Sequence, residues 1–216
     1  MNRQIRGNHG APGFSLIEAL VVISITILLT ASLAVFSRSG EKQIAFFREE
    51  SVLVSSVLRA KGFSIETFQP ELEPGFAPPA SGGRVCGWGI FFEKTPVSRF
   101  VIFTDFAPGG PSAECISADQ QYGGAGSNET FEEFLFDSAV AIDCLALNAS
   151  SGDPCAAPGF ERIHVTFIPP DPMVVFTDET GGSGGKEAVI VLRLNSPNQS
   201  RTSTVRISEA GQVSVN

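Results

Sequence analysis

A long apolar run near the N-terminus is the dominant pattern in the sequence. Residues 14–36 (FSLIEALVVISITILLTASLAVF) contain one charged side chain, that of Glu18. A helix of this length spans about 35 Å, which is enough to cross a bilayer core of about 30 Å. The apolar side chains favour insertion by about 4 to 8 kcal/mol, whereas one charge opposes it by about 3 kcal/mol. The pattern therefore predicts one membrane-spanning helix, and the sequence has no second run of this kind.

A helical pattern with charged positions follows in residues 37–61. Its apolar positions have a spacing compatible with one helix face. They are Ile44, Phe47, Val54 and Leu58, with Val57 nearby and with Phe46, Val52 and Leu53 widening the stripe. Gly62 is the predicted end of the helix. We expect this segment to lay its stripe on a folded domain, either within one helix over 14–61 or as a separate amphipathic helix.

Beyond Gly62, short apolar runs alternate with segments rich in Gly and Pro, which is typical of β-strands and turns. The expected strands are 84–92, 99–104, 139–147, 162–168, 173–177, 188–194, 202–208 and 212–215, with a tight turn at 209–211. Residues 131–137 (FEEFLFD) fit either a short helix or a strand. Because no long amphipathic helices alternate with the strands, a parallel sheet is disfavoured. We expect an α+β fold, in which a long N-terminal helix packs on a mostly antiparallel sheet or a small β-sandwich.

Two long connections, residues 105–130 and 178–187, are rich in glycine. The second contains the run GGSGG at 181–185. Such a run could suggest a phosphate-binding loop, but it lacks the Lys-Ser/Thr ending and the strand–loop–helix frame of those loops. We interpret it as a flexible hairpin loop.

Composition and charge narrow the possible functions. The chain has 216 residues, of which 43% are apolar, so wholesale disorder is excluded. Its 15 basic and 23 acidic residues give a net charge of −8. An acidic body argues against a broad electrostatic interaction with nucleic acid or with anionic lipid.

Candidate catalytic and metal-binding residues are few. Of the two histidines, His9 lies in the N-terminal leader and His164 lies between Ile163 and Val165 in a predicted strand, where an outward polar position is the ordinary interpretation. We therefore expect no catalytic residues, no enzymatic activity and no cofactor. Two acidic groups could bind calcium, but neither has the regular spacing of a ligand loop, so we interpret both as solvated faces without a metal. The groups are Glu129, Glu132, Glu133 and Asp137, and Asp178, Glu179 and Glu187.

The four cysteines, at positions 86, 115, 144 and 155, all follow the apolar run. If the domain is exported, an even count suggests two disulfides, and four cysteines allow three pairings. We favour Cys144 with Cys155, which closes a short loop and leaves Cys86 with Cys115. A zinc site is the alternative, although Cys-x-x-Cys is absent. Buried free thiols at Cys86 and Cys144 also remain open.

The N-terminus has three competing interpretations. A cleaved secretory signal would have a shorter apolar region of about 7–15 residues. A plain signal anchor explains the span but requires neither Gly13 nor Glu18. The third interpretation uses both residues, since a short basic leader ends at Gly13 and an acid follows five residues later.

The segment Gly13-Phe14-Ser15-Leu16-Ile17-Glu18-Ala19-Leu20-Val21-Val22 resembles the prepilin signal of type IV pilins and type II secretion pseudopilins. The resemblance is close over residues 13–36 and looser over the helix beyond. It implies that a prepilin peptidase cuts after Gly13 and methylates the amine of Phe14. It also implies that Glu18 pairs with a free α-amine during filament assembly, for which an acid within an apolar span is suited.

The C-terminal strands loosely resemble those of H-type (GspH/FimT-like) minor pseudopilins and pilins, whose globular part is a β-sandwich. Members that take up DNA carry Gly-Arg-Val-Arg near the end, whereas the matching residues here are Gly211, Gln212, Val213 and Ser214. Both arginines are missing, so binding of nucleic acid is not expected.

These observations predict a leader at 1–13, a membrane and filament-core helix at 14–36, an amphipathic continuation at 37–61 and a β-rich extracytoplasmic domain at 62–216. The resemblance implies a structural subunit of a type IV pilus or a type II secretion pseudopilus. Its implied partners are the prepilin peptidase, other pilin or pseudopilin subunits, an inner-membrane assembly platform and, before assembly, the lipid bilayer of the cytoplasmic membrane. The competing function is a signal-anchored extracytoplasmic binding domain or enzyme that does not polymerise.

Overall fold

The computed structural model describes most of the chain in two units. The described residues are 15–66, 84–107, 114–115, 118–124, 127, 129–148, 154–155, 159–169, 173–182, 184–195 and 200–216. Only the backbone is described for residues 34–39 and 84. Residues group into an N-terminal unit, Met1–Glu41, and a larger compact unit, Lys42–Asn216.

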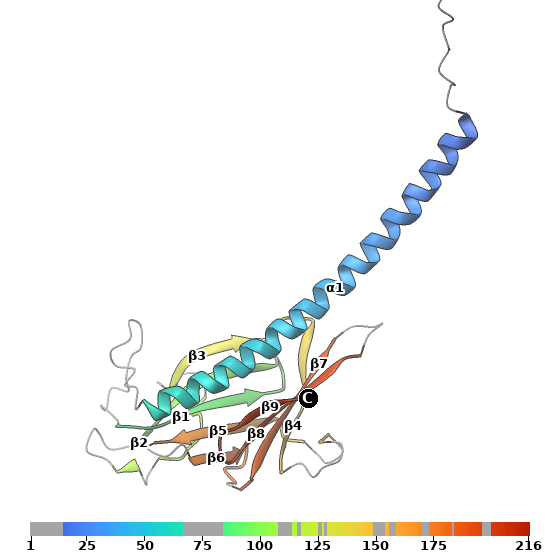
Figure 1. The fold of residues 1–216 in the computed structure, drawn as a ribbon. Helices are drawn as coiled ribbons and strands as arrows, with labels where there is room; N and C mark the ends of the chain where they lie inside the picture. Colours follow the sequence, from blue (N-terminus) through green and yellow to red (C-terminus); the bar gives the residue numbers. More distant parts are fainter. Residues whose placement is uncertain are drawn as a thin grey trace, which may run out of the picture. The chain divides into compact units, whose positions relative to one another are not determined.

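Helix α1 runs from Leu16 to Ile65 and contributes to both units (Figure 1). The segments 14–36 and 37–61 are thus parts of one helix within its described residues, as the first of the two sequence interpretations proposed. The predicted end at Gly62 is wrong, because the helix continues to Ile65. Glycine in a helix costs about 1 kcal/mol relative to alanine. Packing offsets that cost, since the ring of Phe63 lies 4.7 Å from that of Trp88 and the Ser64 hydroxyl donates to the Phe167 carbonyl at 2.9 Å.

The larger unit contains two antiparallel sheets. One has the strand order β3-β2-β1-β5-β6 and the other the order β4-β7-β8-β9. The strands are β1 (Arg84–Glu93), β2 (Arg99–Ala107), β3 (Thr130–Leu135), β4 (Val140–Leu147), β5 (Arg162–Ile168), β6 (Met173–Asp178), β7 (Glu187–Leu194), β8 (Thr202–Ser208) and β9 (Val213–Val215). The α+β class, the antiparallel pairing and the eight expected strands are confirmed. The undecided segment 131–137 supplies β3.

The main core lies between the two sheets and the C-terminal half of α1. Buried side chains of β1, β2 and β5 face those of β4, β7 and β8 across it, for example Trp88 and Phe167 from one sheet and Leu192 from the other. The two sheets are linked by β6 and β7, which lie in different sheets. The prediction that residues 178–187 form a hairpin loop is therefore wrong. The connection crosses between the layers because both β6 and β7 have apolar faces that must be buried.

The helix face that packs on the domain differs from the predicted one. The fully buried apolar residues are Phe46, Leu53, Val57 and Ala60, whereas Ile44, Phe47 and Leu58 are 70%, 44% and 52% exposed. Successive residues of a helix are turned by about 100° around its axis. Measured from Phe46, the other buried residues lie within about 40°, whereas the three exposed residues lie about 100–160° away and form a separate row. Both rows have helical spacing, so the sequence did not distinguish them. Ala60 belongs to the buried row, where its small side chain allows the helix to approach the sheets closely.

The outer face of the five-stranded sheet is also covered. Phe91, Val101 and Phe103 point away from the main core and form a second buried cluster with Tyr122. Tyr122 belongs to the loop 118–124, which is held on the sheet by a hydrogen bond of 2.9 Å from the Thr166 hydroxyl to the Gln120 carbonyl. Across β1, the ring of Phe103 lies against Gly89 so closely that a side chain at this position would overlap it. The central strands of this sheet are therefore covered on both faces.

Candidate functional site

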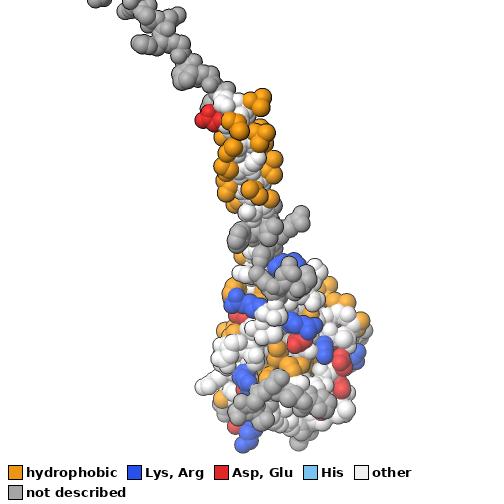
Figure 2. Space-filling model, turned by 90° about the vertical axis from the view of Figure 1, so that its right-hand side faces the viewer, with side chains coloured by type: hydrophobic (Ala, Val, Ile, Leu, Met, Phe, Trp, Pro, Cys, Tyr) orange, Lys and Arg blue, Asp and Glu red, His pale blue; other side chains and the backbone are white. Residues whose placement is uncertain are grey.

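The segment Leu16–Leu33 is the part of α1 with the composition and length of a membrane span. Its 18 residues are 0% buried within the structure, and its side chains include Leu16 at 86% and Leu28 at 68% exposure. Figure 2 shows hydrophobic side chains over the visible face of this segment. An apolar helix with no protein surface against it requires an apolar environment to bury its side chains. By length and composition, this segment meets the requirement for a single-pass membrane anchor.

The polar hydroxyl groups within this segment are satisfied by the helix itself. Ser24, Thr26, Thr30 and Ser32 each donate to the carbonyl oxygen four residues earlier, at 2.7–2.9 Å. In hydrocarbon, an unsatisfied polar group costs several kcal/mol, so this pattern makes the hydroxyl-containing residues compatible with lipid. Glu18 is then the one ionisable side chain in the segment.

Glu18 lies in the first turn of α1 and its side chain is exposed. The positive end of the helix dipole favours a carboxylate there. Gly13 and Phe14, the residues predicted to flank a cleavage site, lie outside the described residues. The helix begins at Leu16, and the amide of Ala19 donates to the Ser15 carbonyl at 3.2 Å.

The exposed row on the C-terminal half of α1 is a second apolar surface. It is formed by Ile44, Phe47 and Leu58. The guanidinium carbon of Arg201 lies 4.3 Å from the centroid of the Phe47 ring, which partly shields that ring. At the edge of this row, Lys61 donates to the Gly211 carbonyl at 2.9 Å, so the helix is fastened to the β8–β9 turn.

Two disulfides stabilise the larger unit. They join Cys86 to Cys115 and Cys144 to Cys155, which is the pairing that the sequence favoured. Within the described residues, no free cysteine remains for a zinc site. Cys86 is an extra residue in β1, since Val85 pairs with Phe106 of β2 and Gly87 pairs with Asp105. The bulge turns Cys86 toward the segment that contains Cys115, which ties the start of the loop 118–124 to the sheet.

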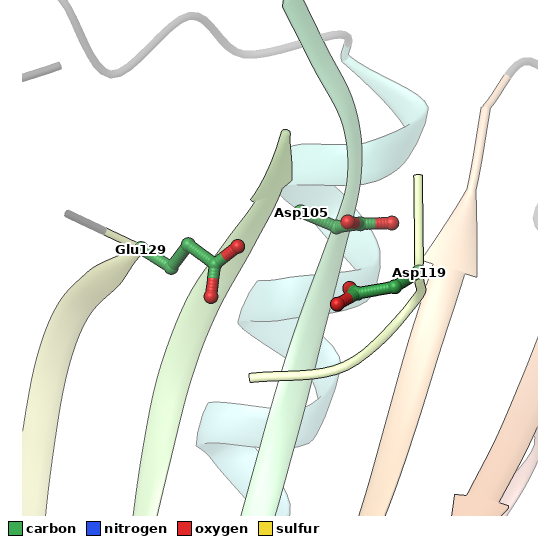
Figure 3. A group of neighbouring side chains, drawn as sticks. All are labelled: Asp105, Asp119 and Glu129. Carbon is green, nitrogen blue, oxygen red and sulfur yellow. The ribbon is translucent and has the colours of Figure 1, made fainter. Parts of the chain in front are cut away.

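Three carboxylates meet where this loop crosses β2. Asp105 lies on β2, Asp119 begins the loop and Glu129 precedes β3, and one oxygen of each lies within 4.8 Å of the others. Figure 3 shows Asp105 next to Asp119, with Glu129 to their left, and the three side chains come from separate segments. The Gly123 amide donates to Glu129 Oε2 at 2.6 Å and the Gln121 amide donates to Asp119 Oδ1 at 3.0 Å. We call these three residues the carboxylate triad.

Burial dominates the electrostatics of the triad. Burial raises the pKa of the Asp105 carboxyl to about 7, and the negative charges of Asp119 and Glu129 add to this increase. Burial and the charge of Asp119 also raise the pKa of Glu129, although the hydrogen bond from the Gly123 amide opposes the change. The three charges therefore destabilise one another when all are ionised.

The acidic groups identified in the sequence are separated by the fold. Glu132 pairs with Arg59 and Glu133 pairs with Arg99, both at 2.5 Å. The carboxylate of Asp137 accepts a hydrogen bond from the Ala139 amide at 2.8 Å. Of this group, only Glu129 belongs to the triad. Asp105 and Asp119 were not predicted from the sequence, because 24 positions separate Asp105 from Glu129 and no ligand spacing links them.

The second acidic group consists of turn acceptors and an ion pair. Asp178 accepts hydrogen bonds from the hydroxyl and amide of Thr180 at 2.6 and 2.8 Å, which lower the pKa of its carboxyl. Glu179 accepts from the Glu161 amide at 2.9 Å, and Glu187 pairs with Arg206 at 3.0 Å. Hydrogen bonds and an ion pair within the fold therefore account for the positions of the three carboxylates.

His164 lies on the outer face of β5, as its strand neighbours suggested, but it is buried there. It is 5% exposed, and the Tyr122 amide donates to its Nδ1 at 2.9 Å. The loop 118–124 covers the sheet face on which His164 lies, which the strand pattern alone did not reveal. Burial lowers the pKa of the imidazole to about 4. His164 also lines a polar hollow of about 320 Å³ together with Glu93, which is held between Arg99 and Arg162 at 2.6 and 2.7 Å.

The buried neutral imidazole predicts acid sensitivity that depends on His164. Its pKa is about 4 in the folded chain and about 6.5 when unfolded, so the unfolded state binds more protons between these values. This contribution to stability is present above pH 6.5 and is lost as the pH falls toward 4. Between pH 7 and pH 4.5, we expect the wild type to lose about 2 kcal/mol more stability than His164→Asn, measured by urea unfolding. The asparagine oxygen can retain the hydrogen bond from the Tyr122 amide. Equal losses in the two proteins would contradict this assignment.

Comparisons of the chain with protein-family models, with curated proteins and with solved structures found no match.

Proposed function

We propose that the chain is a prepilin whose mature form is a structural subunit of a type IV pilus or a type II secretion pseudopilus. The observation that carries this proposal is the exposed apolar segment Leu16–Leu33 with a single acid in its first turn. In the proposed sequence of events, a prepilin peptidase removes residues 1–13 and methylates Phe14, and an inner-membrane platform then transfers the helix from lipid into a filament.

The chemistry of Glu18 supports assembly rather than anchoring alone. A lone carboxylate in an apolar span opposes insertion, so an anchor gains nothing from it. Cleavage after Gly13 would create an α-amine four residues before Glu18, on the same chain and on each neighbouring subunit. Among packed helices, where water is excluded, an amine and a carboxylate attract one another strongly. Their pairing would fix the axial position of one subunit against the next.

The C-terminal half of α1 supports the same role. One face of it is buried in the β-domain, while Ile44, Phe47 and Leu58 remain exposed on the other. A helix that is buried on one side and apolar on the other is suited to contact a further helix. The exposed row therefore offers a packing surface to adjacent subunits after the β-domain has folded.

Sequencing the N-terminus of the mature protein tests the proposal directly. The full chain is produced in cells that contain a prepilin peptidase, and its N-terminus is read from the membrane fraction. We expect N-methylated Phe14 in the wild type and Met1 in Gly13→Leu, because the enzyme must accommodate the residue before the cut. Gly10→Leu is the matched control, and it should be processed normally because Gly10 lies away from the cut.

A wild-type chain that still begins at Met1 would contradict the proposal. The chain would then be a signal-anchored extracytoplasmic domain that does not polymerise. Normal cleavage of Gly13→Leu would refute the assigned cleavage position while leaving the processing event itself in place.

A further inference from the structure

The carboxylate triad contains a buried oxygen whose hydrogen bonding is incomplete. Asp105 is 1% exposed, and its Oδ1 has no hydrogen-bond partner among the described residues. A buried carboxylate oxygen without a partner is unfavourable, and such atoms in folded proteins call for an explanation by water, a proton or an ion. Figure 3 shows this carboxylate beside that of Asp119, with Glu129 to their left, and one oxygen of each of the three lies within 4.8 Å of the others. The incomplete bonding therefore coincides with the place where the three acids converge.

In the part of the chain that the structure describes, no basic side chain forms an ion pair with the triad. Among the described residues, the six ion pairs involve other acids, namely Glu93, Glu132, Glu133, Asp143 and Glu187. The carboxylates of Glu93 and Glu133 show that the same sheet can supply arginine partners where an acid is structural. The triad instead has hydrogen bonds from backbone amides, which leave its negative charge uncompensated.

The geometry fits a hard divalent cation. All the side-chain donors are carboxylate oxygens, which is the ligand type of calcium and magnesium. Calcium binds oxygens at about 2.4 Å, so two oxygens on one ion lie at most about 4.8 Å apart. The triad oxygens lie within 4.8 Å of one another. Magnesium requires shorter distances of about 2.1 Å and therefore a more contracted group.

We propose that Asp105, Asp119 and Glu129 bind a calcium ion that fastens the loop 118–124 to strand β2. The ion would complete the bonding of Asp105 Oδ1 and would neutralise the three converging charges. Because Asp119 is exposed and Glu129 is partly exposed, water can fill the remaining coordination positions. The site concerns the β-domain alone, so it does not depend on cleavage or polymerisation of the chain.

The expected affinity is moderate. Three side chains supply fewer ligands than calcium prefers, and an open side gives dissociation constants on the order of 10⁻⁴–10⁻³ M, as in extracellular modules. With calcium at about ten times the dissociation constant, the thermal unfolding midpoint should rise by about 3–6 °C. Calcium raises the midpoint because it binds the folded state, in which the three carboxylates lie together.

The test uses the full chain in detergent micelles. Calcium chloride is titrated calorimetrically, and thermal unfolding is measured with calcium chloride, with magnesium chloride and with sodium chloride at matched ionic strength. Asp105→Asn and Glu129→Gln remove triad charges with little change of shape. Glu209→Gln is the matched control, since it removes the same charge from an exposed turn outside the triad.

We expect saturable calcium binding and a raised midpoint in the wild type and in Glu209→Gln, and loss of both in Asp105→Asn and Glu129→Gln. Circular dichroism establishes that the variants are folded, and two independent triad variants keep the test decisive if one of them misfolds. Calcium binding that persists in both folded triad variants would overturn the proposal. An absence of calcium binding in the wild type, or a rise in midpoint that sodium chloride reproduces, would also overturn it.

Discussion

A Glu18→Ala variant is expected to enter the membrane and to be cleaved after Gly13, yet to be absent from filaments. Insertion should be retained because removing a charge from the span eliminates an opposing term of about 3 kcal/mol. Incorporation should fail because the α-amine of a neighbouring subunit would lose its carboxylate partner. Breaking one side of a buried ion pair costs about 3–5 kcal/mol, which reduces association by more than about 100-fold. The measurement compares the amounts of the chain in sheared filaments and in the membrane fraction.

Glu41→Ala provides the matched control for this experiment. Glu41 is also an exposed acid on α1, but it lies beyond the apolar segment Leu16–Leu33. We expect it to enter filaments at the wild-type level. Normal incorporation of Glu18→Ala would exclude amine–carboxylate pairing as the basis of assembly. Loss of membrane insertion in that variant would contradict the assigned role of the span.

A Phe46→Ala variant is expected to lose about 3–5 kcal/mol of folding stability. Phe46 is fully buried in the core between α1 and the sheets, so truncation removes a large apolar contact and leaves a cavity. The loss should appear as a lower urea midpoint with an unchanged dependence on denaturant. Because Phe46 belongs to the row that holds α1 on the sheets, its truncation should also increase proteolysis of the helix.

Phe47→Ala is the control at the adjacent position. Its side chain is 44% exposed and contacts Arg201 through the face of its ring, an interaction worth about 0.5–1 kcal/mol at an exposed site. We expect a loss of no more than about 1 kcal/mol. Equal losses in the two variants would mean that the buried face of α1 is assigned incorrectly. In an assembly assay we expect the reverse order, since Phe47 belongs to the row proposed to contact other subunits.

Local patterns predicted the strands well. Runs such as 162–168 and 202–208 have β-branched and aromatic residues between turn-forming segments, and the structure places strands at the same positions. The segment 131–137 was ambiguous because two glutamates interrupt its apolar residues. Pairing with β2 decides its conformation, since Phe134 lies opposite Phe100 and their rings stack at 4.7 Å. Such a contact depends on the tertiary structure and is not encoded in the segment itself.

The residues that required knowledge of the tertiary structure were predicted least well. The buried face of α1 could not be distinguished from a second apolar row, and the covered position of His164 depends on a loop about 42 residues away in sequence. The carboxylate triad likewise assembles from a strand, a loop and a segment before another strand. In contrast, Glu18 was evident from sequence because its surroundings in the chain are almost entirely apolar.

The backbone-bonded hydroxyls of Ser24, Thr26, Thr30 and Ser32 have a consequence for how the helix changes surroundings. Because each donates within its own helix, withdrawing the segment from lipid breaks none of these bonds. The exchange then replaces acyl chains by other apolar side chains, with little enthalpic barrier from polar groups. If the chain polymerises as proposed, the strength of its association would therefore be set by the contacts of Glu18 and of the β-domain.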